Sequence, residues 1–564
     1  MWRTSEKGLA RHKIAGAVIF SFICAITMAP VLFVLVGSID LSQAGQPFRF
    51  GFDGWTSAFS NSKTVSAIGY SFFLSVRIPL AIAIAFPIAW ILVREKVPFG
   101  GFIEKALWFG FFLPTVPLTM GWILLLDCNY GLVNQALVST GLTTDPVFSI
   151  YSIGGIIWVH LTATTIPIMV ILLKPAMAQI DGAYEEAARI SGAGVLTCFA
   201  RITLPLLMPA ILTAFIAGLI RSLEVYEIEQ LIGTPSNIHV YSTRIVDLIN
   251  QQPPALAQAM ALSSLFLFLL LLLAGLYQMY LNKIGSRPTL TGKGLRPQQN
   301  AGAAGRIASM VLLAYLFVAV ALPLSLLVIG SFKDLFGYFT SDWTVSNWEL
   351  VLTDQIFQRS IVLSLSLGLI VAIVGCAFYA GIAWVLVRST LPARQILSVM
   401  IWLPWAIPGV VLGLALLTMF MNTPFLRALI GTAIPIIFAL VLKDMPFGIQ
   451  IISSSIRQIS IDMEEAAAMS GATTRTTLRR IVLPLIAPTM TTVMLLTFVA
   501  CMRDISTITL LSGPGLRTMS LLMFEYATSG KFESAAVVGV ILAAFSLILT
   551  IIAFRVSDAM TVKQ

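Results

Sequence analysis

Residues 185–192 read EEAARISG, and after nine further residues the chain continues with ITLP at residues 202–205. The pattern recurs as EEAAAMSG at residues 464–471 and IVLP at residues 481–484, again with nine residues between them. Each copy predicts a short helix rich in glutamate and alanine, a glycine that allows a sharp exit, and a proline that opens the next helix. Small alanines let such a helix lie in a groove of another protein, where its glutamates can pair with arginines. We therefore expect two docking loops on one chain.

Long apolar segments surround the two loops. The chain has 564 residues, of which 58% are hydrophobic and only 11% charged, and its mean hydropathy of +0.92 excludes a soluble or disordered protein. Twelve windows are long and apolar enough to span a membrane, which predicts an all-α polytopic membrane protein of about twelve transmembrane helices. The first window is too long for a removable signal peptide, so we expect a permanent anchor. The windows lie near residues 14–38, 65–93, 106–126, 148–173, 204–222, 255–281, 307–330, 360–387, 397–419, 429–452, 482–502 and 533–554.

The basic residues indicate the orientation of these windows. The chain carries 35 Lys and Arg against 26 Asp and Glu, which gives a formal net charge of +9. If the N-terminus is cytoplasmic, most of the Lys and Arg fall in cytoplasmic segments, as the positive-inside pattern of membrane proteins requires. The basic balance therefore reflects topology and not a nucleic-acid ligand. We expect both termini in the cytoplasm.

The two halves of the chain also match outside the docking loops. AWILVR at residues 89–94 ends the second window, and AWVLVR at residues 383–388 ends the eighth. Leu-Pro at residues 113–114 in the third window corresponds to Leu-Pro at 403–404 in the ninth. Because each half has six windows, an even number, both halves enter the membrane in the same orientation, and parallel repeats of this kind enclose a central pathway.

This duplication defines the expected domains. The first half covers residues 1–281 and contains the docking loop at 184–205. A polar, basic stretch with prolines and glycines at residues 282–305 is a cytoplasmic linker. The second half covers residues 306–564 and contains the docking loop at 463–484.

The doubled motif resembles EAA-x3-G-x9-I-x-L-P, the coupling motif of permease subunits of type I ATP-binding-cassette (ABC) importers, complete at residues 186–205 and 465–484. The resemblance implies that each loop docks as a coupling helix on one ATPase subunit, so that one chain works with two copies of a cytoplasmic ATPase. It also implies a periplasmic substrate-binding protein, a location in the lipid bilayer of the bacterial inner membrane, and no nucleic-acid partner. The residues expected to couple to the ATPase are Glu185, Glu186, Ala187, Ala188 and Gly192 in the first loop, and Glu464, Glu465, Ala466, Ala467 and Gly471 in the second.

The chain is not expected to be an enzyme. In the stretch nearest to a phosphate-binding loop, residues 285–294, six residues separate Gly285 from Gly292, and Gly294 stands where serine or threonine should bind magnesium. We therefore expect no catalytic residue and no cofactor bound by this chain, with ATP and Mg²⁺ on the partner ATPase. The five cysteines are scattered singly, which disfavours a disulfide framework or a zinc site.

Ionisable residues follow the helices that should line the pathway, and charges at membrane depth usually mark a pathway. Aligning Gly233 with Gly513 places Glu224 opposite Asp504, so each half contributes one carboxylate. Carboxylate oxygens suit hard cations, which makes both residues candidate transient metal ligands. The alternative is structural, with the nearby arginines pairing with the carboxylates as salt bridges at a helix end. The candidate pathway residues are Arg221, Glu224, Tyr226, Glu227, Arg503 and Asp504.

Within this class, an Arg-x-x-Glu-like segment followed by Gly-x-Pro in a fused chain looks most like the ferric-iron permeases, which implies iron transport. That subgroup often has Glu-Leu-Ser where this chain has DIS at residues 504–506. Fused permeases for thiamine or aminoethylphosphonate share the architecture, so these substrates stay alternatives. A self-contained secondary transporter is the other class, but it has no use for two docking loops. Lys443 and Asp444 in the tenth window are either a gate element or buried charges that face the bundle.

Overall fold

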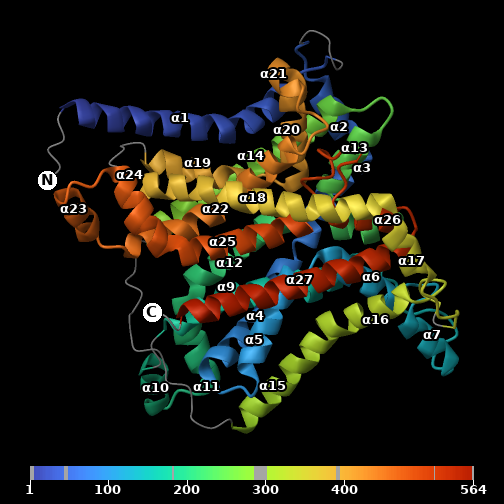
Figure 1. The fold of residues 1–564 in the computed structure, drawn as a ribbon. Helices are drawn as coiled ribbons and strands as arrows, with labels where there is room; N and C mark the ends of the chain where they lie inside the picture. Colours follow the sequence, from blue (N-terminus) through green and yellow to red (C-terminus); the bar gives the residue numbers. More distant parts are fainter. Residues whose placement is uncertain are drawn as a thin grey trace.

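The computed structural model describes residues 6–42, 49–180, 183–284, 302–338, 340–388, 394–513 and 515–561. Within these ranges the chain is helical, with two isolated bridges between extended residues, Asp40 with Phe50 and Lys333 with Trp343. Ten helices are long and apolar enough to cross a membrane, or up to twelve if two bent pairs each count as one span. The predicted all-α polytopic fold is therefore confirmed (Figure 1).

The first half of the described chain is built from fourteen helices. Short π-helical turns at Leu161–Thr165 and Phe199–Thr203 join consecutive helices into continuous spans. The helices are α1 (Glu6–Gly37), α2 (Asp53–Ser60), α3 (Ser62–Leu74), α4 (Arg77–Arg94), α5 (Gly100–Phe112), α6 (Thr115–Leu126), α7 (Leu132–Ser139), α8 (Ile153–His160), α9 (Ile166–Ala178), α10 (Ala183–Ile190), α11 (Val195–Cys198), α12 (Leu204–Glu224), α13 (Tyr241–Asn250) and α14 (Leu256–Ile284).

The second half repeats this order with thirteen helices. Residues 285–301 of the expected linker lie outside the described residues. The π-helical turns Phe317–Ala321 and Leu478–Val482 again join helices into spans. The helices are α15 (Ala303–Leu316), α16 (Leu322–Ser331), α17 (Ser346–Thr353), α18 (Gln355–Arg388), α19 (Arg394–Ala406), α20 (Gly409–Asn422), α21 (Pro424–Arg427), α22 (Ile434–Gln458), α23 (Ile461–Met469), α24 (Thr474–Thr477), α25 (Leu483–Arg503), α26 (Met519–Thr528) and α27 (Phe532–Thr561).

The third and ninth predicted spans are sharply bent. α5 meets α6 at 98°, and the α19–α20 pair is bent by 103°. Pro114 precedes α6 and Pro408 precedes α20, with nearly identical backbone angles (φ −59° and −55°, ψ 144° in both). Proline fixes φ and lacks the N–H that a continuing helix needs, so each proline opens a new helix in a new direction. The match of residues 113–114 with 403–404 is therefore wrong, because Pro404 lies inside α19 and Pro408 is the counterpart of Pro114.

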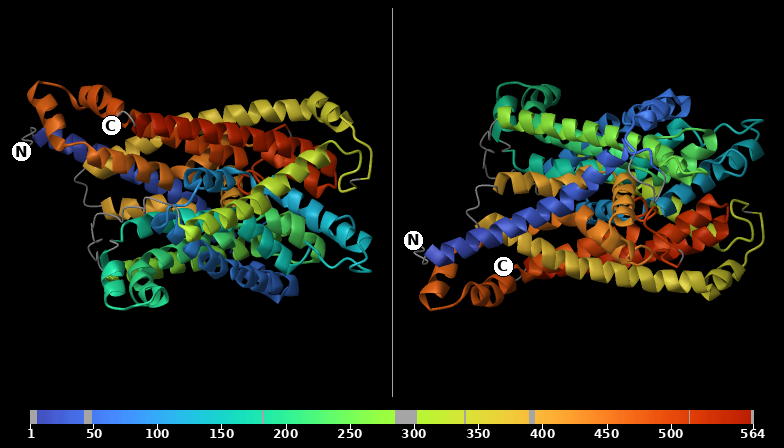
Figure 2. Two further views of the ribbon diagram at one scale, coloured as in Figure 1. Left: turned by 90° about the horizontal axis from the view of Figure 1, so that it is seen from below. Right: turned by 90° about the horizontal axis from the view of Figure 1, so that it is seen from above.

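Each half places its first long helix against the other half. α1 packs on α19 and α20 of the second half, and α16 packs on α6 of the first half. Figure 2 (right) shows α1 lying across the orange helices of the second half. The two helices are equivalent, since each is followed by one of the two isolated bridges. The halves are thus interlocked and share one core, although they are separate in sequence.

Both docking helices lie at one end of the molecule. Figure 1 shows α10 and α23 at the end where α1 begins and α27 finishes, whereas α2, α7, α17 and α26 lie at the opposite end. This arrangement agrees with parallel repeats, because equivalent loops of such repeats share one side of the membrane.

We predict that Gly121→Ala weakens the packing between the halves. A Cβ at Gly121 of α6 would overlap the main-chain oxygen of Pro323 in α16, and a backbone oxygen cannot turn away as a flexible side chain can. Overpacking of this kind costs about 1–3 kcal/mol, which should lower the thermal unfolding temperature in detergent. Gly275→Ala in α14 is the control, because a Cβ there meets nothing within 4 Å. Equal unfolding temperatures for Gly121→Ala and wild type would contradict the close packing.

Candidate functional site

The helices α12 and α25 start next to the docking loops and end where the two halves meet. Glu224, the last residue of α12, is buried. Its Oε2 accepts a hydrogen bond from Nη1 of Arg221 at 2.9 Å, and its Oε1 lies 3.3 Å from Nζ of Lys443. Because Lys443 belongs to α22 of the second half, this second contact joins the two halves.

The same ammonium group binds the carboxylate that follows α25. Nζ of Lys443 donates to Oδ2 of Asp504 at 2.8 Å and to the hydroxyl of Thr507 at 3.1 Å. The amide and the hydroxyl of Thr507 donate to Asp504 at 3.0 and 3.1 Å. Lys443 therefore stands between one carboxylate of each half and balances the charge of both. We call Arg221, Glu224, Lys443 and Asp504 the inter-half cluster.

The two carboxylates expected to face each other do come together, but only one predicted arginine pair forms. Arg221 pairs with Glu224 as expected. The guanidinium of Arg503 instead donates to the main-chain oxygen of Phe111 and lies 5.1 Å from the centre of the Phe111 ring. Phe111 belongs to the first half, so Arg503 also spans the interface. Lys443, whose role the sequence left open, takes the place expected for Arg503 beside Asp504.

Near the cluster, the structure pairs the residues of the two halves one position away from the alignment predicted from Gly233 and Gly513. Oγ of Ser242 donates to the main-chain oxygen of Val225 at 2.5 Å, and Oγ of Ser520 donates to that of Asp504 at 3.1 Å. Val225 and Asp504 each follow the last residue of their helix with extended backbone. Asp504 is therefore the counterpart of Val225, and the predicted equivalence with Glu224 is wrong. The second half has one more residue before its glycine, which shifts the alignment.

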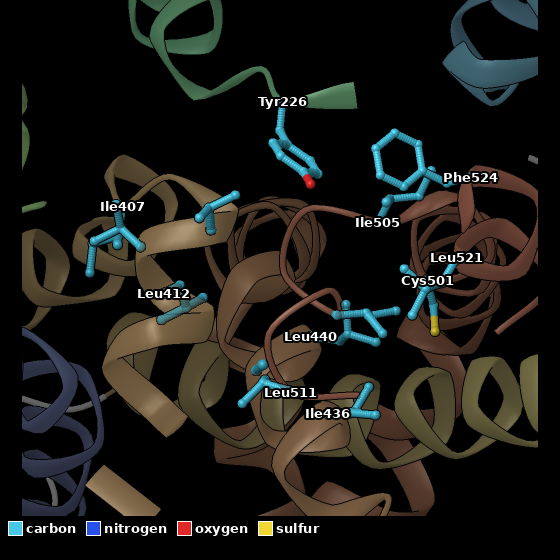
Figure 3. Packing of buried hydrophobic residues seen from close by; sticks show 14 of the residues in the cluster. Tyr226, Ile407, Leu412, Ile436, Leu440, Cys501, Ile505, Leu511, Leu521 and Phe524 are labelled. Carbon is cyan, nitrogen blue, oxygen red and sulfur yellow. The ribbon is translucent and has the colours of Figure 1, made fainter. Parts of the chain in front are cut away.

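Two further predicted pathway residues lie beside the cluster. Tyr226 is buried, and its ring packs on Phe524 of the second half with centroids 5.4 Å apart (Figure 3). It lies in an apolar contact between the halves, which Figure 3 shows together with Ile505. Glu227 is half-buried. Burial raises the pKa of its carboxyl, and the charge of Asp504 raises it further, so Glu227 holds its proton to a higher pH than an ordinary glutamate.

A second ionic cluster holds the end of α12, and the sequence patterns did not single it out. Oε1 of Glu229 lies 2.8 Å from Nε2 of His160 and 3.2 Å from Nη1 of Arg77, and all three residues are at most 2% exposed. Nη2 of Arg77 donates to the main-chain oxygen of Ser222 at 2.8 Å. Because Ser222 lies two residues before Glu224, this triad fixes the backbone that carries Glu224. The available signal was an arginine and a histidine inside apolar windows.

The second half has no such triad at the equivalent positions. Val371, Ala439 and Ile508 occupy the places of Arg77, His160 and Glu229, and all three are fully buried. The first half thus fixes its pathway helix with ions, and the second half with apolar packing. The duplicated halves are therefore not interchangeable at the level of the inter-half cluster.

We predict that Glu229→Gln destabilises the protein strongly. The change removes the counter-charge of Arg77 in a buried site, where breaking an ion pair typically costs about 3–5 kcal/mol. The thermal unfolding temperature in detergent measures this loss. The matched control is Ile508→Val at the equivalent position, where a smaller apolar side chain costs about 1 kcal/mol. If Glu229→Gln is no less stable than Ile508→Val, the triad does not hold α12 as described.

Each docking loop is tied to a long helix that precedes it. Arg94 at the end of α4 contacts Oε1 of Glu185 at 3.4 Å, and Arg388 at the end of α18 contacts Oε1 of Glu464 at 2.9 Å. Glu185 and Glu464 thus face the membrane-spanning helices, whereas Glu465 is exposed. The side chain of Glu186 lies outside the described residues.

The outer surface of both docking helices is exposed and partly apolar. Ile190, the last residue of α10, is 88% exposed, and Met469, the last residue of α23, is 90% exposed. Large apolar side chains exposed at equivalent positions indicate an interaction surface. The predicted coupling alanines belong to the same helices: Ala187 and Ala466 are exposed, and Ala188 and Ala467 are half-buried.

We predict that bulky residues at the helix exits impair coupling. Gly192 (φ +85°) and Gly471 (φ +81°) have left-handed backbone, which costs other residues about 1–2 kcal/mol. No neighbour lies within 4 Å of a Cβ at either site, so backbone strain is the only expected effect. Gly192→Val/Gly471→Val should lower transport in reconstituted vesicles while insertion into the membrane survives. Gly194→Ala is the control, and wild-type transport by the double variant would show that the exits are not needed.

Part of the second half matches a known family, and longer stretches of the chain are similar to known permeases. Residues 373–562 match the family described as binding-protein-dependent transport system inner membrane component. The chain is 26% identical over 408 residues to the ferric transport system permease protein FbpB of Actinobacillus pleuropneumoniae, covering 70% of this chain and 57% of that protein. It is 26% identical over 555 residues to the probable ABC transporter permease protein y4fN of Sinorhizobium fredii, covering 94% and 95%. It is also 26% identical over 255 residues to the sulfate transport system permease protein CysT of Synechocystis sp., covering 43% and 86%.

These matches confirm the resemblance inferred from the doubled motif. The chain is a multi-span membrane permease. It is an ABC importer permease, and the match to the Sinorhizobium fredii protein along nearly its whole length agrees with the fused, duplicated form.

Proposed function

We propose that the chain imports ferric iron, taking it from a periplasmic binding protein and releasing it into the cytoplasm by alternating access. The observation that carries the proposal is the inter-half cluster, in which carboxylates of both halves, Glu224 and Asp504, converge on one site. The similarity to a ferric permease over 70% of the chain supports the same substrate.

The partners follow from the docking loops. Two loops on one chain fit two copies of a cytoplasmic ATPase, which would bind ATP and Mg²⁺ and perform the hydrolysis, so this chain is not itself the enzyme. The exposed Ile190 and Met469 offer each ATPase copy a similar apolar contact. We expect both termini on the cytoplasmic side of a bacterial inner membrane. This expectation is supported by α10, α23, the start of α1 and the end of α27, which share one end of the molecule (Figure 1).

The chemistry of the cluster suits a transient cation path. A highly charged ion in an apolar region needs oxygen ligands and counter-charge. The Lys443 ammonium occupies the space between Glu224 and Asp504 that such an ion would take. Lys443 contacts Glu224 of the first half and Asp504 of its own half. If the halves separate, the contact with Glu224 must break, whereas the contact with Asp504 can remain. Among the described residues, no group of three or more His, Cys, Asp or Glu is arranged to hold a metal.

The same cluster favours a second candidate, an oxyanion such as sulfate. Arg221 and Lys443 lie together in it, and Arg503 donates across the same interface. Charged N–H donors bind oxyanions strongly. A separated interface would free Arg503 from Phe111 and leave Lys443 with one carboxylate instead of two. The similarity to a sulfate permease over 43% of the chain supports this alternative.

Uptake by reconstituted vesicles distinguishes the substrates. The permease, its ATPase and its binding protein are reconstituted together, and ATP-driven uptake of ferric ion, sulfate, aminoethylphosphonate and thiamine is measured. We expect uptake of iron only. Uptake of another solute without iron would overturn the proposed substrate, while the importer assignment would stand.

We predict that the triple variant Glu224→Gln/Lys443→Met/Asp504→Asn loses iron uptake by at least tenfold and retains basal ATP hydrolysis. Removing Lys443 together with both carboxylates leaves only Arg221 without its partner, and because that side chain is 39% exposed the fold should survive. The double variant Glu224→Gln/Asp504→Asn leaves Lys443 uncompensated and should unfold at a lower temperature. Glu525→Gln, in an exposed pair with Arg517, is the control and should transport normally. A stable triple variant that imports iron at the wild-type rate would exclude the cluster as the ion path.

A further inference from the structure

The AWxLVR repeat at residues 89–94 and 383–388 has no role in the proposed substrate path, yet its arginines make matching contacts in both halves. Both Nη atoms of Arg94 donate to the main-chain oxygen of Ile180 at 3.3 Å, and Nη2 lies 3.4 Å from Oε1 of Glu185. Ile180 and Glu185 lie on either side of the start of α10.

The second half repeats this arrangement with closer contacts. Nη2 of Arg388 donates to the main-chain oxygen of Ile459 at 2.9 Å and of Ile456 at 3.2 Å, and Nε lies 2.9 Å from Oε1 of Glu464. Ile459 and Ile180 occupy equivalent positions, as do Glu464 and Glu185. The same construction in two halves of divergent sequence indicates a shared requirement.

These ion pairs are shielded from water. The side chains of Arg94 and Glu185 are at most 7% exposed, and those of Arg388 and Glu464 at most 15%. Shielded pairs are weakened less by salt than surface pairs and resist separation. In the first half, Oε1 of Glu185 also accepts from the hydroxyl of Thr203 at 3.0 Å, which adds the start of α12 to the tie.

The tied helices are those that surround the inter-half cluster. α4 packs on α9 and α12, and α18 packs on α22 and α25. α12 ends at Glu224, α22 carries Lys443, and Asp504 follows α25. A displacement of a docking helix would thus pass to α4 through Arg94, or to α18 through Arg388. From there it would reach the helices of the inter-half cluster, which pack directly on α4 and α18.

We propose that Arg94 and Arg388 are positioning residues that transmit the displacement of each docking helix to the cluster helices. Glu185 and Glu464 then act inside this permease, as the partners of these arginines, while the exposed Glu465 faces the ATPase. The proposal rests on the proposed coupling to a separate ATPase, but not on the identity of the substrate.

The test separates transmission from simple stabilisation of the loop. The full complex is prepared with Cys24, Cys128, Cys198 and Cys376 replaced by alanine, which leaves Cys501, a buried residue of α25 three residues before Asp504, as the only thiol in the permease. The rate at which a small thiol reagent labels Cys501, with and without ATP, reports rearrangement at the end of α25, next to the inter-half cluster, for any substrate. ATP hydrolysis is measured on the same samples.

For Arg388→Met we expect the ATP-dependent increase in Cys501 labelling to fall at least tenfold while ATP hydrolysis stays within twofold of wild type. Arg388→Lys keeps the charge but cannot reach the carboxylate and both carbonyls as a guanidinium does, so an intermediate response is expected. The charge exchange Arg388→Glu/Glu464→Arg should recover at least half of the labelling response. Arg457→Met, at an exposed arginine in the last turn of α22, is the matched control and should behave as wild type.

Three outcomes would overturn the proposal. One is a wild-type labelling response in Arg388→Met. Another is an equal fall of labelling and hydrolysis in Arg388→Met and Arg388→Lys, because a loop that has merely lost its structure lowers both together. The third is a lack of any ATP response in the wild-type complex, which would overturn the proposed ATP-driven function as well. A response to ATP without iron uptake would reject only the substrate.

Discussion

A charge inside an apolar helix bundle needs a counter-charge within reach, and Lys443 supplies it to both halves of this permease. Its ammonium group lies 3.3 Å from Glu224 of the first half and 2.8 Å from Asp504 of the second. The contact with Glu224 crosses the interface that the proposed alternating-access cycle would open. The closed interface is therefore stabilised by a contact that is lost when the halves separate, which leaves Lys443 with Asp504 alone and Glu224 with Arg221 alone.

The duplicated halves reach this site by different means. In the first half, Arg77, His160 and Glu229 hold the last turn of α12 with buried ionic contacts. In the second half, apolar residues fill the equivalent positions. The helix that each half places against the other, α1 or α16, joins residues of both halves in one large hydrophobic cluster. The two halves thus form a symmetric arrangement of helices around an asymmetric inter-half cluster. Such a centre suits one substrate path between the halves better than two equal paths.

The cytoplasmic side retains the symmetry that the centre has lost. Arg94 and Arg388 hold equivalent glutamates and equivalent main-chain oxygens, and Ile190 and Met469 are exposed to nearly the same degree. This contrast has a physical reason. The two identical ATPase copies that we propose would present the same surface to both docking helices, so both helices would have to offer the same contacts. A substrate that passes between the halves meets both at once and imposes no such requirement.

The sequence by itself determined the spans, the duplication and the docking loops, because composition, hydropathy and a motif with fixed spacing are local properties of the chain. It also placed carboxylates of both halves near one pathway, and Glu224 and Asp504 do meet. Only the tertiary structure decided that Lys443 bridges them, that Arg503 turns to Phe111 instead, and that Asp504 corresponds to Val225. These facts depend on the bend at Pro408, on the interlocked first helices and on one extra residue before Gly513. Contacts between residues far apart in the chain follow from how whole helices pack, and no local pattern encodes that packing.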